Sequence, residues 1–226
     1  MSAAMSPHVT SLTDMVRIVT ARSPSAVAIE HDHGTLTYGQ FWDRSVRLAN
    51  VMLARGLKAG DRVALFAQNR HEYLESYVGL LLAGLVAVPA NYRLTPTELA
   101  FLLENSGARG LLVGEEYLAH VQTVRESGAR MPQVVIVYGS DASHENSYGR
   151  AIAAAATSLP PRVAGLNDPA AIFYTSGTTG FPKGAVMSRG RCFGCRSWRH
   201  AQDLAQGPAC GAARSSALLA SSTASR

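Results

Sequence analysis

Apolar and polar positions along the chain follow two recurring patterns, one typical of helices and one typical of buried strands. Apolar residues return every three or four positions in the helical segments, whereas the strand segments are short and almost continuously apolar. The predicted helices cover residues 11–23, 37–56, 70–84, 95–107 and 115–128. The predicted strands cover residues 60–68, 86–91, 109–114, 132–139 and 170–175. Strands separated by single helices favour an α/β fold with a largely parallel sheet and covering helices.

Local signals mark the ends of several of these elements. Thr95 is a suitable N-cap for the helix that follows it, Pro96 fits the first helical position, and Glu98 can reach back to the cap. Gly107 is expected to end that helix. Near the N-terminus, a polar turn at residues 31–34 predicts two short strands that form a hairpin.

The pattern changes abruptly near Met187, which we take as the main boundary. Residues 12–187 carry the periodicity, whereas residues 188–226 are rich in alanine, serine and arginine and are predicted to be an unrelated, disordered or out-of-frame tail. Up to Gly190 there are 16 basic against 15 acidic residues, and the remainder has five arginines against one acid. The net charge of +5 therefore reflects the tail, which argues against a nucleic-acid-binding face.

Composition adds three expectations about the class of protein. With 47% hydrophobic and 16% charged residues, the chain has the composition of a soluble globular protein. It has no uninterrupted apolar stretch long enough to span a membrane and no signal-peptide pattern at its N-terminus, so we expect a cytoplasmic location. All three cysteines lie in the tail, so disulfides are not expected to stabilise the body. Nothing in the sequence indicates an oligomeric state.

The segment "FYTSGTTGFPKGAVMS", Phe173 to Ser188, carries the clearest candidate chemistry. A buried strand leads into a loop in which hydroxyl residues alternate with glycines. The hydroxyl residues are Ser176, Thr178 and Thr179, and the glycines are Gly177, Gly180 and Gly184. Glycines allow backbone amides to converge on an anion, and hydroxyls add adaptable donors. Lys183 adds a mobile positive charge that suits a polyphosphate. The chain has only one other lysine, Lys58.

The generic phosphate-binding loop G-x-x-x-x-G-K-[ST] fits this segment only in part. Gly177 and Lys183 have the required separation, but Pro182 replaces the second glycine and has no N–H to donate. Gly184 stands where a magnesium-binding hydroxyl is needed. An ordinary P-loop nucleoside triphosphatase is therefore rejected. Clusters rich in serine, threonine and glycine usually form polar surface turns, and local sequence leaves this as the alternative.

The longer string "YTSGTTGFPKGAV" resembles the signature loop of the adenylate-forming, or AMP-binding, enzymes. This superfamily includes acyl- and aryl-CoA synthetases, luciferases and peptide-synthetase adenylation domains. The segments "GDRVAL", "GLLLAGLVAVPAN" and "LTPTELAFLLENSGAR" follow the family's order upstream. The resemblance covers residues 12–187 and corresponds to the N-terminal part of the family domain. Within it, "VPANYRLTPTEL" is more similar to the CoA synthetases than to the peptide-synthetase domains.

The resemblance implies an ATP-dependent carboxylic acid:CoA ligase that acts on a fatty or aromatic acid. A carboxylate attacks the α-phosphorus of ATP and releases pyrophosphate, and CoA thiolate then displaces AMP from the acyl-adenylate. ATP, Mg²⁺ and CoA, with a small-molecule carboxylic acid, are the implied reactants and cofactors. Residue by residue, the resemblance assigns ATP phosphate binding to Thr175, Ser176, Gly177, Thr178, Thr179, Gly180, Lys183 and Gly184.

Family members are more than twice as long as this chain. The resemblance places their adenine, ribose, magnesium and CoA contacts and the adenylation lysine beyond the loop, so we assign no catalytic or metal-binding residue here. Whether this chain is itself an enzyme stays open, and the alternative is a non-catalytic fragment that at most binds nucleotide weakly. Two interpretations of the tail also compete. One is a truncated or out-of-frame end of a synthetase, and the less favoured one is a zinc site formed by Cys192, Cys195, His200 and Cys210.

Overall fold

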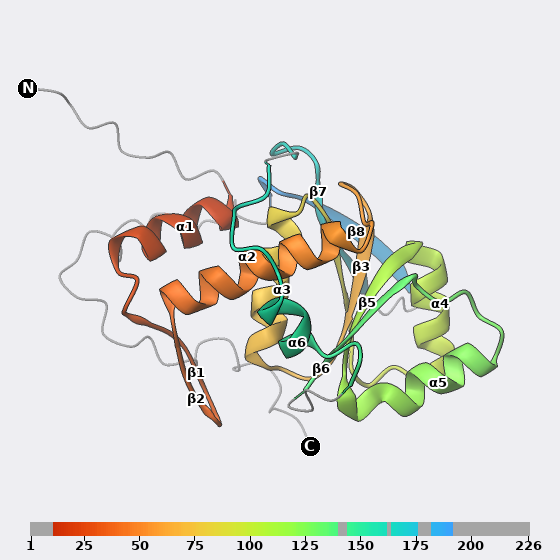
Figure 1. Ribbon diagram of the computed structural model, residues 1–226. Coiled ribbons are helices and arrows are strands. Elements are labelled where there is room, and N and C mark those ends of the chain that lie inside the picture. The colour runs from red at the N-terminus through yellow and green to blue at the C-terminus, as the bar shows by residue number, and fades with distance from the viewer. Residues whose placement is uncertain (1–10, 140–143, 162–163, 176–181, 192–226) are drawn as a thin grey trace, which may run out of the picture.

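The computed structural model describes residues 11–139, 144–161, 164–175 and 182–191. The helices are α1 (Leu12–Arg22), α2 (Tyr38–Ala54), α3 (His71–Leu82), α4 (Pro96–Ser106), the single 3-10 turn η1 (Glu115–Tyr117), α5 (Leu118–Glu126) and α6 (Tyr148–Ala153). The strands are β1 (Val27–His31), β2 (Gly34–Thr37), β3 (Arg62–Phe66), β4 (Val86–Ala90), β5 (Ala108–Gly114), β6 (Val134–Tyr138), β7 (Pro169–Thr175) and β8 (Lys183–Ser188). Their order confirms the predicted α/β class (Figure 1).

One sheet organises the molecule. Its strands lie in the order β6-β5-β3-β4-β7-β8, while β1 and β2 form a separate antiparallel hairpin, as the turn at residues 31–34 predicted. The neighbours from β6 to β7 are parallel, which confirms the largely parallel sheet. The last pair, β7 and β8, is antiparallel. Strand β8 was not predicted, because the segment Lys183–Ser188 lacks a strand-like apolar pattern and is mostly exposed.

Two apolar layers enclose this sheet, one on each face. The first lies between the sheet and helices α2, α3 and α6, and the second lies between the sheet and helices α4 and α5 (Figure 1). Successive residues of β3 alternate between them: Val63 and Leu65 enter the first layer, whereas Ala64 and Phe66 enter the second. Because both faces of the strand are buried, its sequence is apolar throughout.

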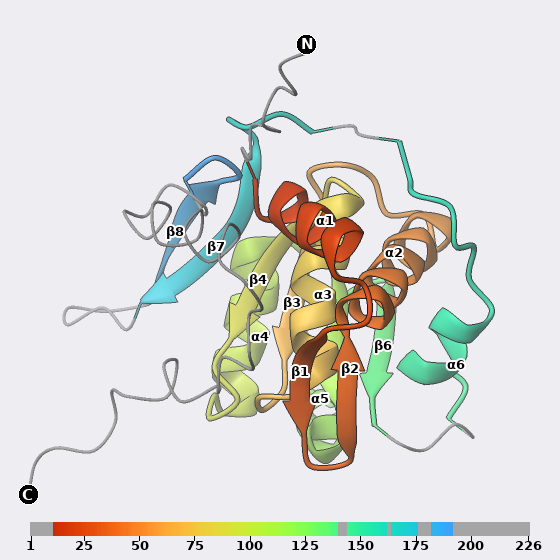
Figure 2. The same ribbon diagram turned by 90° about the vertical axis from the view of Figure 1, so that its left-hand side faces the viewer.

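Helix α1 packs outside the first layer. Val16 of α1 meets Phe41 of α2 and Val78 of α3 in a third, smaller apolar cluster. Figure 2 shows α1 lying across the outer side of these helices, with the β1–β2 hairpin below it. The N-terminal segments therefore add a further layer to the face of the sheet that α2 and α3 already cover.

The predicted start and end of α4 are confirmed. The Glu98 amide donates to Thr95 Oγ1 at 3.3 Å, and the Glu98 carboxylate accepts from the Thr95 amide at 2.8 Å, which completes a capping box with Pro96 in the first turn. The backbone and side-chain hydrogen bonds from Thr95 lower the pKa of Glu98. Gly107 ends the helix with a φ of 61°, a left-handed conformation that glycine adopts without strain.

Candidate functional site

The two ends of the candidate phosphate-binding loop lie at the carboxyl edge of the parallel strands. Strand β7 ends at Thr175 and β8 begins at Lys183, and these two residues form the last matched pair of the hairpin. The pair therefore lies at the edge of the sheet where β3, β4 and β5 also end. Open α/β sheets bind ligands at this edge, because the loops that follow parallel strands meet there.

The structure describes three of the predicted phosphate-binding residues. Thr175, Lys183 and Gly184 lie at the two ends of the loop, and all three are exposed. Within the described part of the chain, Lys183 forms no ion pair with a carboxylate. The other predicted residues lie outside the described ranges, and they are Ser176, Gly177, Thr178, Thr179 and Gly180.

Gly184 has a packing role that the sequence analysis did not foresee. A Cβ atom on Gly184 would lie 2.8 Å from Ile172 Cγ2, too close without a shift of that side chain, and in tight contact with Tyr174 Cζ at 3.2 Å. The missing side chain leaves room for the Tyr174 ring, which packs against the second apolar layer. Gly184 thus allows side chains of β7 to lie over β8 just behind the loop.

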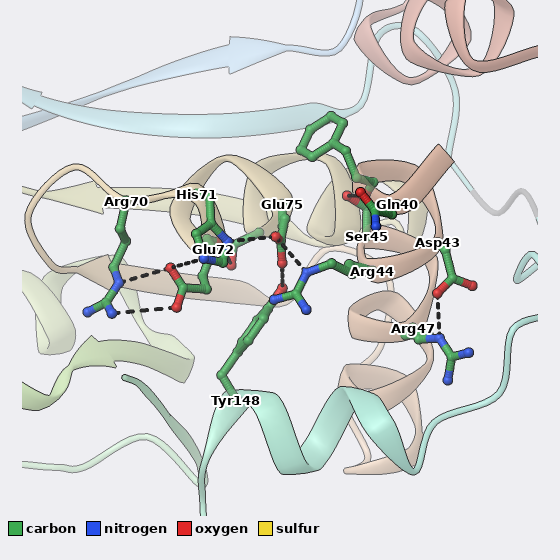
Figure 3. A network of polar contacts seen from close by, with 12 residues as sticks. Gln40, Asp43, Arg44, Ser45, Arg47, Arg70, His71, Glu72, Glu75 and Tyr148 are labelled. Atoms are coloured by element: carbon green, nitrogen blue, oxygen red, sulfur yellow. Dashed lines mark hydrogen bonds and ion pairs between the residues drawn. The ribbon is translucent and has the colours of Figure 1, made fainter. Parts of the chain in front are cut away.

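A network of polar groups is centred on Glu75 in the first half of α3 (Figure 3). The side chain of Glu75 is fully buried and accepts hydrogen bonds from Arg44 Nε at 2.8 Å and from the Tyr148 hydroxyl at 2.6 Å. His71 Nδ1 lies 2.9 Å from the same carboxylate. Burial raises the pKa of Tyr148 well above its usual value, which keeps the hydroxyl protonated as a donor. Each partner comes from a different turn or helix, so the network joins α2, α3 and α6.

No metal site is apparent within the described residues. No group of three or more histidine, cysteine, aspartate or glutamate side chains there could hold a metal ion. The alternative zinc ligands lie outside the described residues, and they are Cys192, Cys195, His200 and Cys210. Among the helices of the described ranges, none is both long and apolar enough to cross a membrane.

Comparison with known proteins decides the family. A model of the AMP-binding enzymes matches residues 16–212. The chain belongs to this family. The match extends past the predicted boundary at Met187, and the structure also continues past it, since Ser188 is the last residue of β8 and a turn follows as far as Arg191.

Curated relatives within the AMP-binding family are ligases that act on acids of different kinds. The chain is 32% identical over 195 residues to the fatty acid–[acyl-carrier-protein] ligase ScoC of Streptomyces coeruleorubidus. This alignment covers 84% of this chain and 35% of that protein. It is 37% identical over 168 residues to a feruloyl-CoA synthase of an Amycolatopsis species, covering 74% of this chain and 31% of that protein. The chain therefore spans about a third of the length of these relatives.

Solved structures of the family share the fold described above. The inhibitor-bound N-terminal domain of FACL13 from Mycobacterium tuberculosis superposes with a TM-score of 0.71 at 31% identity, covering 80% of this chain and 45% of that domain. The anthranilate CoA ligase AuaEII in complex with anthranoyl-AMP superposes with a TM-score of 0.75 at 24% identity, covering 84% of this chain and 37% of that one. At that lower identity the second comparison concerns the fold alone.

Proposed function

We propose that this chain is the ATP-phosphate-binding part of an ATP-dependent ligase that joins a fatty or aromatic carboxylic acid to CoA through an acyl-adenylate. In this proposal the chain contributes the loop from Thr175 to Gly184 that binds the ATP phosphates. Family membership supports adenylate chemistry, and the relatives named above act on fatty and aromatic acids. Mg²⁺ and CoA belong to the proposed reaction, but we assign no residue of the described chain to either.

The pairing of Thr175 with Lys183 is the observation that carries this proposal. The pair places one hydroxyl and one ammonium side by side, both exposed, where the loop leaves the carboxyl edge of the sheet. Hydroxyl and ammonium groups donate to phosphate oxygens, and no nearby carboxylate in the described chain competes for the ammonium.

The chemistry of adenylation explains why such donors are useful there. When a carboxylate attacks the α-phosphorus, negative charge accumulates on the departing pyrophosphate. Donors held in place before the reaction stabilise that charge as it develops, which lowers the barrier. In the proposed site, Lys183 and the loop hydroxyls hold the β- and γ-phosphates in line with the attacking acid.

Substitution of Lys183 by alanine tests the phosphate-binding role directly. Loss of one charge-assisted interaction should weaken MgATP binding by about ten-fold or more, as measured by isothermal titration calorimetry on the 226-residue chain. AMP binding should change little, because AMP lacks the β- and γ-phosphates.

Lys58 provides the matched control, because it is the only other lysine of the chain. It is exposed in the turn before β3, at the amino edge of the sheet and therefore opposite the loop. Lys58→Ala should bind MgATP as the wild type does. Equal loss of affinity in the two variants would indicate a general charge effect, and MgATP binding that survives Lys183→Ala would remove the loop from the site.

A further inference from the structure

In the described part of the chain, the hairpin that carries the loop joins the rest of the sheet through β7 alone. Among the described residues, the ladder between β4 and β7 matches the single pair Ala87 and Ala171, whereas six pairs join β7 to β8. Strand β8 forms the edge of the sheet, and Val186 is 62% exposed there. Figure 2 shows β7 and β8 together along one side of the molecule, beyond β4. Because β8 is an edge strand that pairs only with β7 in the described ranges, contacts between the hairpin's side chains and the neighbouring helices help to fix its orientation.

Two side chains supply such contacts, one at each end of the hairpin. Near the base, Arg189 is buried and donates to the carbonyl oxygens of Leu81 at 2.7 Å and Leu85 at 3.1 Å, at the end of α3. Near the loop, the Tyr174 hydroxyl donates to Asn105 Oδ1 at 2.6 Å. Asn105 belongs to α4, so this bond connects the hairpin to a helix that covers the second face of the sheet.

The hydrogen bond between Tyr174 and Asn105 lies one residue away from the start of the loop. Tyr174 precedes Thr175 in β7, and it is matched with Gly184, which follows Lys183 in β8. The bond to Asn105 therefore acts on the ladder position next to the pair that closes the loop. Its geometry is favoured by Gly184, since a Cβ atom at that position would overlap Ile172 and press against the Tyr174 ring.

We propose that Tyr174 and Asn105 form a positioning pair that fixes the loop-bearing end of the β7–β8 hairpin and so sets the affinity for a nucleoside triphosphate. The effect on nucleotide affinity rests on the proposed function. The positioning of the hairpin by Tyr174 and Asn105 does not. Neither residue needs to touch the nucleotide. Tyr174 acts through Thr175 and Lys183 by limiting the orientations that the two can adopt, which reduces the ordering cost of binding.

Removal of the hydrogen bond tests this pair. Tyr174→Phe keeps the ring and deletes only the hydroxyl, and Asn105→Ala deletes the acceptor. Each variant should weaken MgATP binding by about five-fold, the effect of one ordinary hydrogen bond, and the double variant should be no weaker than either single one. Asn105→Asp, which keeps an oxygen acceptor, should retain the wild-type affinity.

Hydrogen–deuterium exchange distinguishes positioning from a general loss of stability. In Tyr174→Phe, peptides covering residues 169–175 and 183–188 should exchange faster, whereas peptides from β3 and β5 should be unchanged. Gln133→Ala is the matched control, because it deletes an exposed amide oxygen that accepts from Arg109 Nη2 at 2.7 Å, at the amino edge of the sheet. It should change neither the exchange of the hairpin nor the binding of MgATP.

The outcomes separate this inference from the proposed function. If the wild type binds MgATP and Tyr174→Phe binds it equally well, or binds it more weakly without faster exchange in the hairpin, the positioning role is wrong. If the wild type binds no MgATP, the proposed function of this chain fails. In that case the exchange data still decide whether Tyr174 and Asn105 hold the hairpin, since unchanged exchange would refute the pair.

Discussion

The buried carboxylate of Glu75 shows how one charged residue is held inside an apolar layer. Burial alone would raise its pKa, but hydrogen bonds with His71 and Arg44, together with the charge of Arg44, outweigh burial and hold the pKa below its usual value. A carboxylate whose pKa is lower in the folded than in the unfolded state stabilises the fold when the pH lies above its unfolded value. That contribution is lost as the pH falls through the folded value.

Glu75→Gln should therefore destabilise the protein in a pH-dependent way. At neutral pH the variant loses the charge that pairs with Arg44, which should reduce the free energy of unfolding by about 2–3 kcal/mol. The difference from the wild type should narrow as the pH falls below about 4.3, the usual pKa of a glutamate, because the unfolded chain then takes up a proton that the folded carboxylate binds only at lower pH. Urea unfolding at several pH values measures both effects.

Glu104→Gln provides the control for this experiment. Glu104 is exposed on α4, and its substitution should leave the stability almost unchanged across the pH range. A constant difference between Glu75→Gln and the wild type at every pH would contradict the account, because it would show that shape rather than charge determines the loss.

Local sequence signals indicate this buried network only weakly. His71 and Glu75 lie four residues apart within a predicted helix, a spacing that places two side chains on one face. Their burial depends on how α3 rotates against the sheet, and the partners Arg44 and Tyr148 come from distant parts of the chain. Contacts of that kind are set by tertiary packing and cannot be predicted from local spacing.

Individual elements differ in how far their own sequence determines them. The start of α4 was predictable because the capping box involves Thr95 and Glu98, only three residues apart. Strand β8 was not, because it depends on its pairing with β7 and on the contacts of Arg189 with the end of α3. The predicted boundary between Met187 and Ser188 accordingly falls one residue inside β8.

Arg189→Met should show how much that contact contributes to the fold. The substitution removes two charged hydrogen bonds and leaves the buried carbonyl oxygens of Leu81 and Leu85 without this donor, which should cost about 2–3 kcal/mol. The neighbouring Arg191 is exposed, so Arg191→Met should change the stability by no more than about 0.5 kcal/mol. Urea midpoints provide the comparison. Equal midpoints for the two variants would mean that the residues after β8 do not support the hairpin.

For the molecule as a whole, the class of fold followed from the sequence but the order of the strands did not. Continuous apolar strands separated by single helices predicted a parallel sheet with two covered faces, and both features are present. The strand order requires pairings between distant segments, such as β4 with β7, about which local periodicity contains no information. The candidate loop was recognised through family resemblance, and its place at the carboxyl edge became clear only from the sheet.

The set of binding contacts in the whole molecule also determines what the isolated chain can catalyse. Adenylation requires the acid to be held against the α-phosphorus while the pyrophosphate is bound, and correct placement of two reactants accounts for much of such a rate enhancement. The chain spans about a third of the length of its curated relatives, and the family resemblance places the adenine, ribose and magnesium contacts beyond the loop. The isolated chain should therefore bind MgATP without catalysing acid-dependent exchange of labelled pyrophosphate into ATP.

The exchange assay needs a positive control and a variant that identifies the site. The full-length feruloyl-CoA synthase of Amycolatopsis, assayed with its own acid, should show exchange under the same conditions. If the isolated chain also shows exchange with a fatty or aromatic acid, and Lys183→Ala abolishes it, the prediction is wrong. The residues present would then suffice to bring acid and ATP together, and the chain would contain a complete adenylation site in about a third of the length that its relatives use.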